Sequence, residues 1–249
     1  MSDHRQKIKY ANSMSMESKT FNLFSDYLYP RYIKDPRYFP ILIVTAIIAS
    51  HLKLTTFVGI AVIVNLFATI SGYLINDIED REDDVNSPGK RFINPFGYKI
   101  WNTLSGYVSL ISIGLATLIL SYFFNGLMPG LIILSNLLIG YLYSWKNLRL
   151  KSMPIIDILS HTYFLGVSTM IYFVFLPNAA WNLKTTLLIL TVFFASAHSD
   201  LDNEYRDFDD DEKAGIRNSA SYLGKKATLV LTRLSLSAAV VMGILGILI

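Results

Sequence analysis

The sequence predicts an all-α polytopic membrane protein, a bundle of about seven transmembrane helices. Apolar residues make up 52% of the chain and charged residues only 16%, whereas a soluble domain carries about a quarter charged residues. Apolar segments recur that are long enough to cross a hydrocarbon core about 30 Å thick as helix. The chain has no cysteine, which excludes disulfides, thiolate metal sites and a cysteine nucleophile.

Seven apolar segments qualify as spans: 36–52, 55–75, 99–124, 127–144, 154–176, 182–199 and 228–249. The first is short and polar at both ends, and the third is long enough to tilt. None alternates polar and apolar residues with the period of a strand. Residues 1–35 are polar and are predicted to form a cytoplasmic N-terminal arm, followed by a single transmembrane domain over 36–249.

The basic residues predict the orientation in the membrane. Nineteen of the 22 Lys and Arg residues lie before the first span or in the loops after spans two, four and six. The opposite side has only Lys53 and Lys184. By the positive-inside rule, the N-terminus and the three basic loops are cytoplasmic. We therefore expect an integral membrane protein of a bacterial or archaeal cell membrane, with its polar loops facing the cytoplasm.

Fourteen of the 19 acidic residues lie in two windows, 77–84 and 200–212, both on the predicted cytoplasmic side. Each window fits the pattern Asn-acid-x-x-Asp-x-x-x-Asp, and each follows an apolar span. Positions i, i+4 and i+8 share one face of a helix. The pattern therefore predicts two acidic helix faces, formed by Asn76, Asp80 and Asp84 with Asp77 nearby, and by Asn203, Asp207 and Asp211.

Closely spaced carboxylates on a helix repel one another, so a cation is expected to compensate them. Mg²⁺ prefers carboxylate oxygens, keeps several waters and shares substrate phosphates. Two such faces with Mg²⁺ between them would form a diphosphate pocket. The alternative is a pair of solvated acidic loop ends that only mark the membrane boundary. The remaining acids, Glu79 and Glu82 among them, are expected to be solvated.

Asn76-Asp77-x-x-Asp80-x-x-x-Asp84 resembles the first aspartate-rich motif of the UbiA-type intramembrane prenyltransferase superfamily. Asp207-x-x-x-Asp211, with Gly215 and then Leu223-Gly224, resembles the second motif. Tyr143-Ser144, Leu148-Arg149-Leu150-Lys151, Pro154 and Asp157 resemble the loop after the family's fourth helix, closest to carotenoid-elongating and related bacterial members. After the first motif, Arg91 matches the family, but the proline that usually follows it is absent.

The resemblance implies helices around a central prenyl-binding cavity and Mg²⁺-dependent transfer from an allylic isoprenyl diphosphate to a lipophilic or aromatic acceptor. It implies that the metal ligands are Asn76, Asp77, Asp80, Asp84, Asp207 and Asp211. The diphosphate contacts it suggests are Asn76, Lys90, Arg91, Lys146, Arg149, Lys151 and Asn203. Each basic residue can equally be a lipid-facing charge. Asp80, Asp207 and Tyr143 are the catalytic candidates, and an interfacial tyrosine belt also explains Tyr143.

The family usually has nine helices, so the seven spans here predict a laterally open pocket or a homo- or hetero-oligomer through the last span. That span carries small residues that favour close helix contact, Ala239, Gly243 and Gly246 among them. We expect His161 and His198 to be packed, hydrogen-bonded histidines. Asp157 is expected to cap a helix or pair with a loop base.

Other functions remain open from the sequence. A terpene cyclase of the same superfamily would use the same acidic faces. A cation transporter would place its acids near the membrane midplane, whereas these crowd the cytoplasmic end. A purely structural membrane protein would not need the repeated motif. No basic stripe or motif supports nucleic-acid binding.

Overall fold

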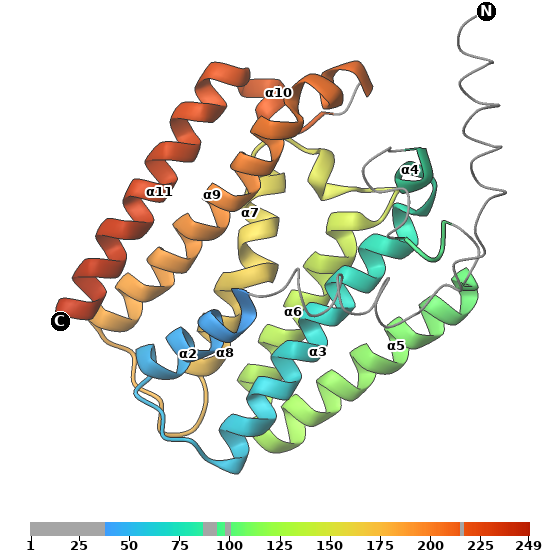
Figure 1. Cartoon of the computed structure of the whole chain (residues 1–249). Helices are drawn as coiled ribbons and strands as arrows, with labels where there is room; N and C mark the ends of the chain where they lie inside the picture. The colour runs from blue at the N-terminus through green and yellow to red at the C-terminus, as the bar shows by residue number, and fades with distance from the viewer. Residues whose placement is uncertain (1–37, 87–93, 98–100, 215–216) are drawn as a thin grey trace, which may run out of the picture.

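The computed structural model describes residues 38–86, 94–97, 101–214 and 217–249. The predicted arm, 1–35, lies outside them. Within these residues the chain forms helices and loops and no strand (Figure 1). The first half contains α2 (Phe39–Ala49), α3 (Thr56–Glu79), α4 (Arg81–Asn86), α5 (Thr103–Leu120), the π-helical turn η3 (Ser121–Asn125) and α6 (Leu127–Ser144). The second half contains the 3-10 turn η4 (Leu150–Ser152), α7 (Ile156–Thr162), the π-helical turn η5 (Tyr163–Val167), α8 (Ser168–Val174), α9 (Leu183–Ala214), α10 (Ser219–Leu223) and α11 (Lys225–Leu248).

The prediction of a helical membrane bundle is confirmed. Four helices in the described residues are long and apolar enough to cross a membrane: α3, α5 continued by η3, α6 and α11. The other three predicted spans are not single regular helices of membrane-spanning length. The first is represented by the 11-residue helix α2, and the fifth is interrupted by η5. The sixth is α9, which runs for 32 residues through the second acidic window.

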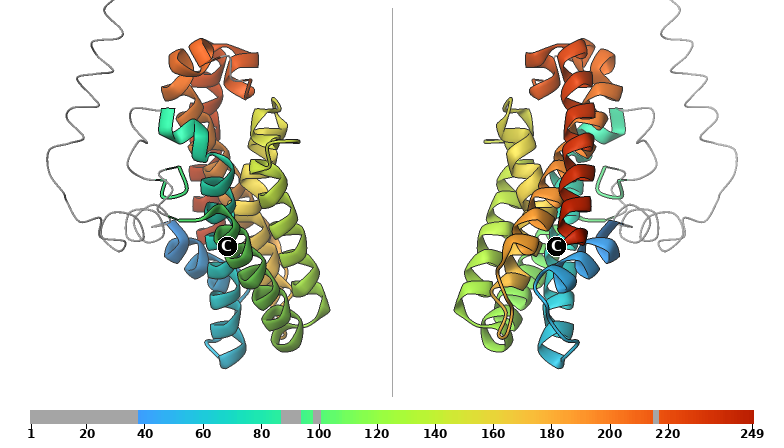
Figure 2. Two further views of the ribbon diagram at one scale, coloured as in Figure 1. Left: turned by 90° about the vertical axis from the view of Figure 1, so that its right-hand side faces the viewer. Right: turned by 90° about the vertical axis from the view of Figure 1, so that its left-hand side faces the viewer.

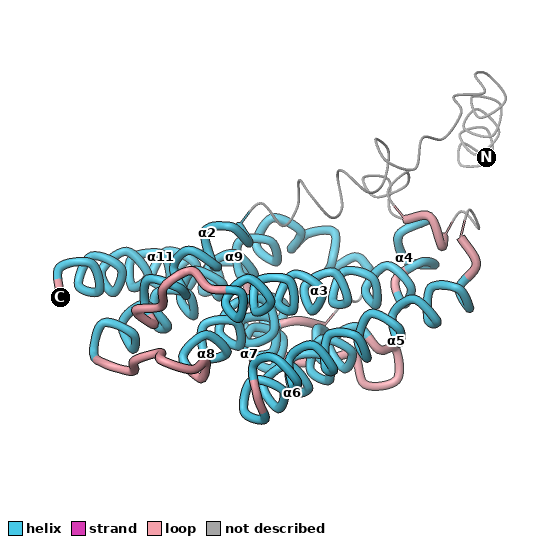
Figure 3. The backbone as a smooth tube through the Cα atoms, turned by 90° about the horizontal axis from the view of Figure 1, so that it is seen from below, coloured by secondary structure: helices cyan, strands magenta, loops and turns pink. Residues whose placement is uncertain are grey.

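The helices form two groups joined by the elements in the middle of the bundle. α3, α5 and α6 pack together on one side, and α9 packs along α11 on the other; Figure 1 shows both groups, and Figure 2 shows them from the two sides. α2, α7 and α8 lie between the groups, as Figure 3 shows from below. The first acidic window lies at the C-terminal end of α3 and the second at the C-terminal end of α9. Each group of helices therefore carries one acidic window.

The core lies where α2, α3, α8 and α9 meet. Ala46 and Ala61 are fully buried there and let neighbouring helices approach closely. Tyr172 and Phe173 fill the space beside them without exposed surface. The Tyr172 hydroxyl donates to Asn125 Oδ1 over 3.0 Å, so the core ties α8 to the end of η3.

The small residues of α11 contact α9 of the same chain. A Cβ at Gly246 would lie 3.0 Å from Leu188, and one at Gly243 would lie 3.4 Å from Thr191. Ala239 is also buried. These small residues are therefore used for close packing between α9 and α11, and an oligomer through the last span stays a prediction.

Candidate active site

The first acidic motif bends at its central aspartate. α3 ends at Glu79, Asp80 is its C-cap with φ −87° and ψ 4°, and α4 begins at Arg81. The predicted single helix face through Asn76, Asp80 and Asp84 is therefore wrong beyond Asp80. The first half of the pattern holds, because Asn76 Nδ2 donates to Asp80 Oδ2 over 2.8 Å.

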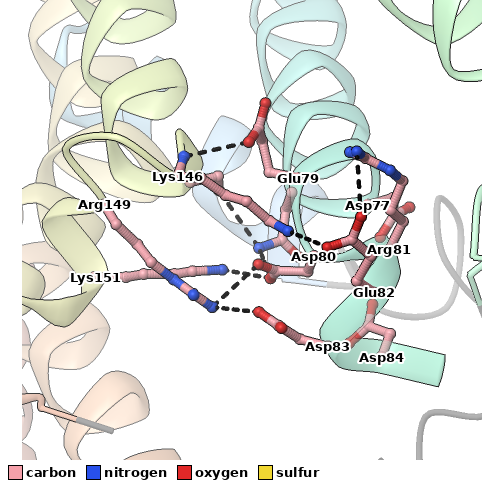
Figure 4. A network of polar contacts seen from close by, with 12 residues as sticks. Asp77, Glu79, Asp80, Arg81, Glu82, Asp83, Asp84, Lys146, Arg149 and Lys151 are labelled. Atoms are coloured by element: carbon pink, nitrogen blue, oxygen red, sulfur yellow. Dashed lines mark hydrogen bonds and ion pairs between the residues drawn. The ribbon is translucent and has the colours of Figure 1, made fainter. Parts of the chain in front are cut away.

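Asp80 is the centre of a network of ion pairs with the loop after α6 (Figure 4). Lys151 Nζ contacts Asp80 Oδ2, and Arg149 Nη2 lies 3.4 Å from Asp80 Oδ1. Asn76 also approaches Ser144 Oγ at the end of α6, at 3.4 Å. Asp80 is 8% exposed. Residues about 70 positions apart in the sequence thus form one polar site.

Arg149 is held in an unusual conformation. Its φ is 47° and its ψ 66°, in the left-handed region that side chains other than glycine seldom adopt. Its guanidinium also reaches Asp83 Oδ2, at 2.9 Å. Nε of the same group is buried and has no hydrogen-bond partner. A buried donor without an acceptor destabilises the folded protein. An anion bound beside Arg149 would give Nε the acceptor that it lacks.

The outer acids of the first window lie at the surface, as expected. Glu82 pairs with Lys146 Nζ at 2.9 Å, and its side chain is 67% exposed. The hydrogen bond from Lys146 holds the pKa of Glu82 below its ordinary value, with Lys146 and Arg81 adding charge attraction. Such an exposed pair contributes little to stability, so its main effect is to keep Lys146 beside the site.

Glu79 is not solvated, contrary to expectation. It is 4% exposed. The Tyr107 hydroxyl donates to Glu79 Oε1, and the Lys146 backbone N–H donates to Glu79 Oε2 over 3.2 Å. The loop after α6 therefore contacts two consecutive acids of α3 through different groups.

Asn94 fixes the bend from the other side. Its Nδ2 donates to the Asp77 backbone carbonyl over 2.7 Å and to Asp84 Oδ2 over 2.9 Å. Its Oδ1 accepts from the Phe96 N–H. Asp77 is 2% exposed. Sequence reasoning did not select Asn94, because nothing in the spacing of the motif indicates a partner beyond it.

The second motif lies on the last turns of α9, and here the predicted single helix is found. Asn203 and Asp207 are exposed. Asn203 accepts a hydrogen bond from Arg206. Asp211 Oδ2 accepts from Asn218 Nδ2 over 2.9 Å, just before α10.

A buried carboxyl cluster, formed by Asp157, Asp200 and Glu204, lies at the start of the second motif. Asp157 is 1% exposed and accepts from the backbone N–H and hydroxyl of Ser219, both over 2.5 Å. Glu204 accepts from the Ala220 N–H over 2.8 Å. Asp157 therefore binds the first turn of α10, and it also accepts from the Ile158 N–H in the first turn of its own helix α7 over 2.7 Å. Burial raises the pKa of Glu204, and the carboxyls of Asp157 and Asp200 raise it further.

Tyr143 lies between the two acidic helices. Its hydroxyl interacts electrostatically with Asp200 and Glu204 on α9 and, more weakly, with Asp157 and with Asp80 of the first motif. Its ring packs against Phe164, with centroids 5.0 Å apart, and against His161 at 6.1 Å. Both histidines are packed and paired, as predicted: His161 with Ser196 at 3.4 Å, and His198 with the Thr232 carbonyl at 3.0 Å.

In the described residues, no group of three or more Asp, Glu or His side chains is placed to hold a metal ion. The donor set nevertheless fits Mg²⁺, which in phosphate sites takes one or two carboxylates and completes its shell with water and phosphate oxygens. Of the other three predicted diphosphate contacts, Lys90 and Arg91 lie outside the described residues and Asn203 is exposed on α9. The structure thus brings together Asn76, Asp80, Lys146, Arg149 and Lys151, with Tyr143 alongside.

These features define a helical membrane protein with an acidic and basic polar site at one end of its bundle. The chain matches the UbiA prenyltransferase family over residues 38–249, and it belongs to that family. The predictions of fold, family and enzyme class are confirmed.

Among curated proteins, the chain is similar to the digeranylgeranylglyceryl phosphate synthase of Methanothermobacter thermautotrophicus, with 34% identity over 110 residues. That match covers 44% of this chain and about a third (36%) of the relative.

Solved structures show the same fold. A UbiA homologue from Archaeoglobus fulgidus bound to DMAPP and Mg²⁺ superposes with a TM-score of 0.71, 18% identity and coverage of 88% of this chain and 76% of that one. The same homologue bound to GPP and Mg²⁺ gives a TM-score of 0.72, at 18% identity, over 88% and 77% of the two chains. At this identity the similarity establishes the fold alone.

Proposed function

We propose that this protein transfers a prenyl group from an allylic isoprenyl diphosphate to a lipophilic acceptor within the membrane, in a Mg²⁺-dependent reaction. The observation that carries the proposal is the contact of Asp80 with Lys151 and Arg149. It brings one carboxylate and two cationic side chains together in one partly enclosed site, and these are the groups that a Mg²⁺ diphosphate needs. The relatives bound to DMAPP or GPP with Mg²⁺ support the same substrate class.

The basic loop is the part of the chain suited to the diphosphate. Lys151 and Arg149 pair with Asp80 in this structure, and a diphosphate would offer the same cations further anionic oxygens. Arg149 Nε, buried and unpaired, is a donor available to such an oxygen. Lys146 lies at the edge of the site, and we propose Lys90, Arg91 and Asn203 as further contacts.

The metal would be held by oxygens of Asn76, Asp77, Asp80 and Asp84 on one side and of Asp207 and Asp211 on the other. When bound there, Mg²⁺ neutralises charge on the departing diphosphate. Asn76 orients the Asp80 carboxylate, and Asn94 holds Asp84 against the end of α3. These contacts pre-position the carboxylates, so little reorganisation is needed when the substrate binds.

The carbon–oxygen bond of the substrate breaks and the diphosphate leaves with the bonding electrons; the electron-rich acceptor then bonds to the allylic carbon and loses a proton to water. Tyr143 is suited to this step, because its ring lies between the two acidic helices and packs on Phe164. Aromatic faces attract cations. We propose that Tyr143 shelters the positive charge that develops on the prenyl group. The surrounding apolar helices keep water out of the reaction.

The test uses the full chain purified in detergent. It is incubated with allylic diphosphates of several chain lengths and with candidate lipid acceptors, and released diphosphate and products are measured. We expect release that needs both Mg²⁺ and an acceptor, with the prenylated acceptor detected by mass spectrometry. Release without acceptor, accompanied by a cyclised hydrocarbon, would instead establish a terpene cyclase. No release from any pair, with folded protein and Mg²⁺ present, would contradict the proposal.

A further inference from the structure

A single charged residue interrupts the apolar length of α11. Beyond Lys226 the residues of α11 are apolar or carry a hydroxyl group, apart from Arg233. The Arg233 side chain is exposed. Few residues of this apolar stretch are buried in the bundle, and α11 stands at the outer edge of the bundle (Figure 2). Arg233 therefore lies on a surface that a bilayer would cover.

Lys226 lies on the same face of α11. It precedes Arg233 by seven residues, or two turns, so the two side chains leave the helix within about 20° of each other. Both are exposed. Thr228 and Thr232 lie on a different face and are buried, and the Thr232 carbonyl lies 3.0 Å from His198 Nδ1 on α9. The face that carries Lys226 and Arg233, which we call the outer face of α11, points away from the bundle.

The chain supplies no anion for these two cations within the part that the structure describes. Lys225, the neighbour of Lys226, pairs with Asp209 at 2.6 Å. No hydrogen bond or ion pair links Lys226 or Arg233 to another described side chain. A charge at the depth of the hydrocarbon core is unfavourable unless it reaches water or a counter-charge. The outer face of α11 is therefore a site where an external anion stabilises the protein.

The direction of the Arg233 side chain decides the level at which that anion lies. Arg233 is about 10 Å along α11 from Lys226. Side chains on a helix tilt toward its N-terminus, and a long basic side chain can keep its stem in lipid while its head reaches the interface. The N-terminus of α11 lies beside α10 and the acidic end of α9 (Figure 1). The guanidinium thus reaches back toward Lys226, and both cations meet one headgroup layer.

Two cations select the kind of headgroup. A phosphate offers a guanidinium two parallel hydrogen bonds, so Arg233 alone would accept the phosphate of any phospholipid. Lys226 beside it repels the ammonium of a choline or ethanolamine head and attracts a head of net negative charge. Val230, one turn from both cations, is short and 56% exposed, which leaves space for a phosphate between them.

We propose that Lys226 and Arg233 bind the phosphate of one anionic phospholipid on the outer face of α11. The acyl chains lie along the exposed apolar residues further down this face, Val240 and Ile244 among them. The bound lipid sets the depth of α11 in the bilayer. Because α9 packs against α11, it also sets the depth of the helix that carries the second acidic motif.

Photocrosslinking in nanodiscs tests the site. The probe is phosphatidylglycerol with a diazirine near its headgroup, present in trace amount in phosphatidylcholine nanodiscs that hold the full chain. We expect the probe to label the peptide that contains Lys226 and Arg233. Unlabelled phosphatidylglycerol should compete at concentrations about tenfold or more below those that phosphatidylethanolamine requires. Equal competition by the two lipids would overturn the proposal.

Charge removal identifies the residues that hold the lipid. Arg233→Leu should reduce labelling by about tenfold or more, because it removes hydrogen bonds to a charged group. Lys226→Leu should reduce labelling by about fivefold. Lys225→Leu is the control, since Lys225 is adjacent but pairs with Asp209, and it should stay within about twofold of wild type. Unchanged labelling in Arg233→Leu would contradict the assignment.

A carboxylate placed between the two cations should displace the lipid. Position 230 follows Lys226 by four residues and precedes Arg233 by three, so the side chain of Val230→Glu can pair with both. This variant should lose the advantage of phosphatidylglycerol over phosphatidylethanolamine. Val230→Gln has a side chain of the same size without the charge and should keep that advantage within about twofold. An equal advantage in both variants would show that these cations do not hold the headgroup.

A partner chain that placed its own carboxylate on the outer face of α11 is the competing explanation. Light scattering of the purified protein in detergent with phosphatidylglycerol separates the two. A lipid site predicts the same particle mass for wild type and Arg233→Leu. A lower mass in Arg233→Leu, together with no headgroup labelling of wild type, would assign this face to a protein contact and refute the proposal.

Discussion

Lys151 contacts the carboxylate of Asp80, and so the loop after α6 closes over the bend between α3 and α4. Arg149 reaches the other oxygen of the same carboxylate, at 3.4 Å. The ion pair is largely shielded, with 16% and 11% of the Lys151 and Asp80 side chains exposed. A shielded charge pair is strongly disturbed when one partner is removed. This makes both residues informative positions for substitution.

Asp80→Asn and Asp207→Asn should each reduce diphosphate release by about a hundredfold or more, because a metal-bound charge contributes several kcal/mol to the transition state. Asp209→Asn is the control. Asp209 lies in the same acidic window, but it is exposed and pairs with Lys225 at 2.6 Å. Its substitution should leave turnover within about twofold. Near wild-type release from the Asp80 and Asp207 variants would show that these residues hold no catalytic metal.

Lys151→Met should raise the KM for the prenyl diphosphate by roughly tenfold to a hundredfold, since hydrogen bonds to charged groups contribute about 1.5–3 kcal/mol. The measurement is a titration of the diphosphate at saturating Mg²⁺ and acceptor. Lys184→Met, in the first turn of α9 and on the opposite predicted side, should change nothing. A normal KM in Lys151→Met would mean that Lys151 serves only to hold the bend at Asp80.

Glu204→Gln should flatten the loss of stability with rising pH. The pKa of Glu204 is raised in the folded protein by burial and by Asp157 and Asp200. A carboxyl with a raised folded pKa contributes stability that is complete below its unfolded pKa of about 4.3, and this is lost as pH rises toward the folded value. Thermal unfolding in detergent between about pH 5 and pH 8 measures it. Equal slopes for wild type and variant would refute the assignment.

Cysteine labelling tests the orientation, which follows from the basic residues alone. The chain has no cysteine of its own, so the background is clean. Asn147 in the loop after α6 and Ala180 before α9 are both exposed. A membrane-impermeant thiol reagent should label Asn147→Cys only from the cytoplasmic side and Ala180→Cys only from the other. Labelling of both from one side would contradict the predicted topology.

The motif spacing predicted the local part of the site. The contact of Asn76 with Asp80 follows from their separation of four residues on a helix. The bend after Asp80 could not be predicted in the same way. Asn94, from a later segment of the chain, donates hydrogen bonds to the Asp77 carbonyl and to Asp84 on the two sides of the bend, and the motif spacing gives no sign of this partner.

Glu79 was missed for a related reason. Its burial depends on Tyr107 from α5 and on the Lys146 amide, and neither partner stands at a fixed sequence distance from it. The only available signal was the position of Tyr107 in the first turns of an adjacent apolar span. Spans five and six were predicted as segments, but the π-helical interruption and the extension of α9 depend on packing rather than on hydropathy.

The length of α9 has a consequence for where substrate is captured. A helix of 32 residues is about 48 Å long, and a hydrocarbon core takes only about 30 Å of it. α11 packs against α9, and the turns of α9 beyond the length of a hydrocarbon core carry Asp207 and Asp211. If the proposed function holds, the diphosphate of the substrate would bind in water at this end of α9 while its prenyl chain stays in the bilayer.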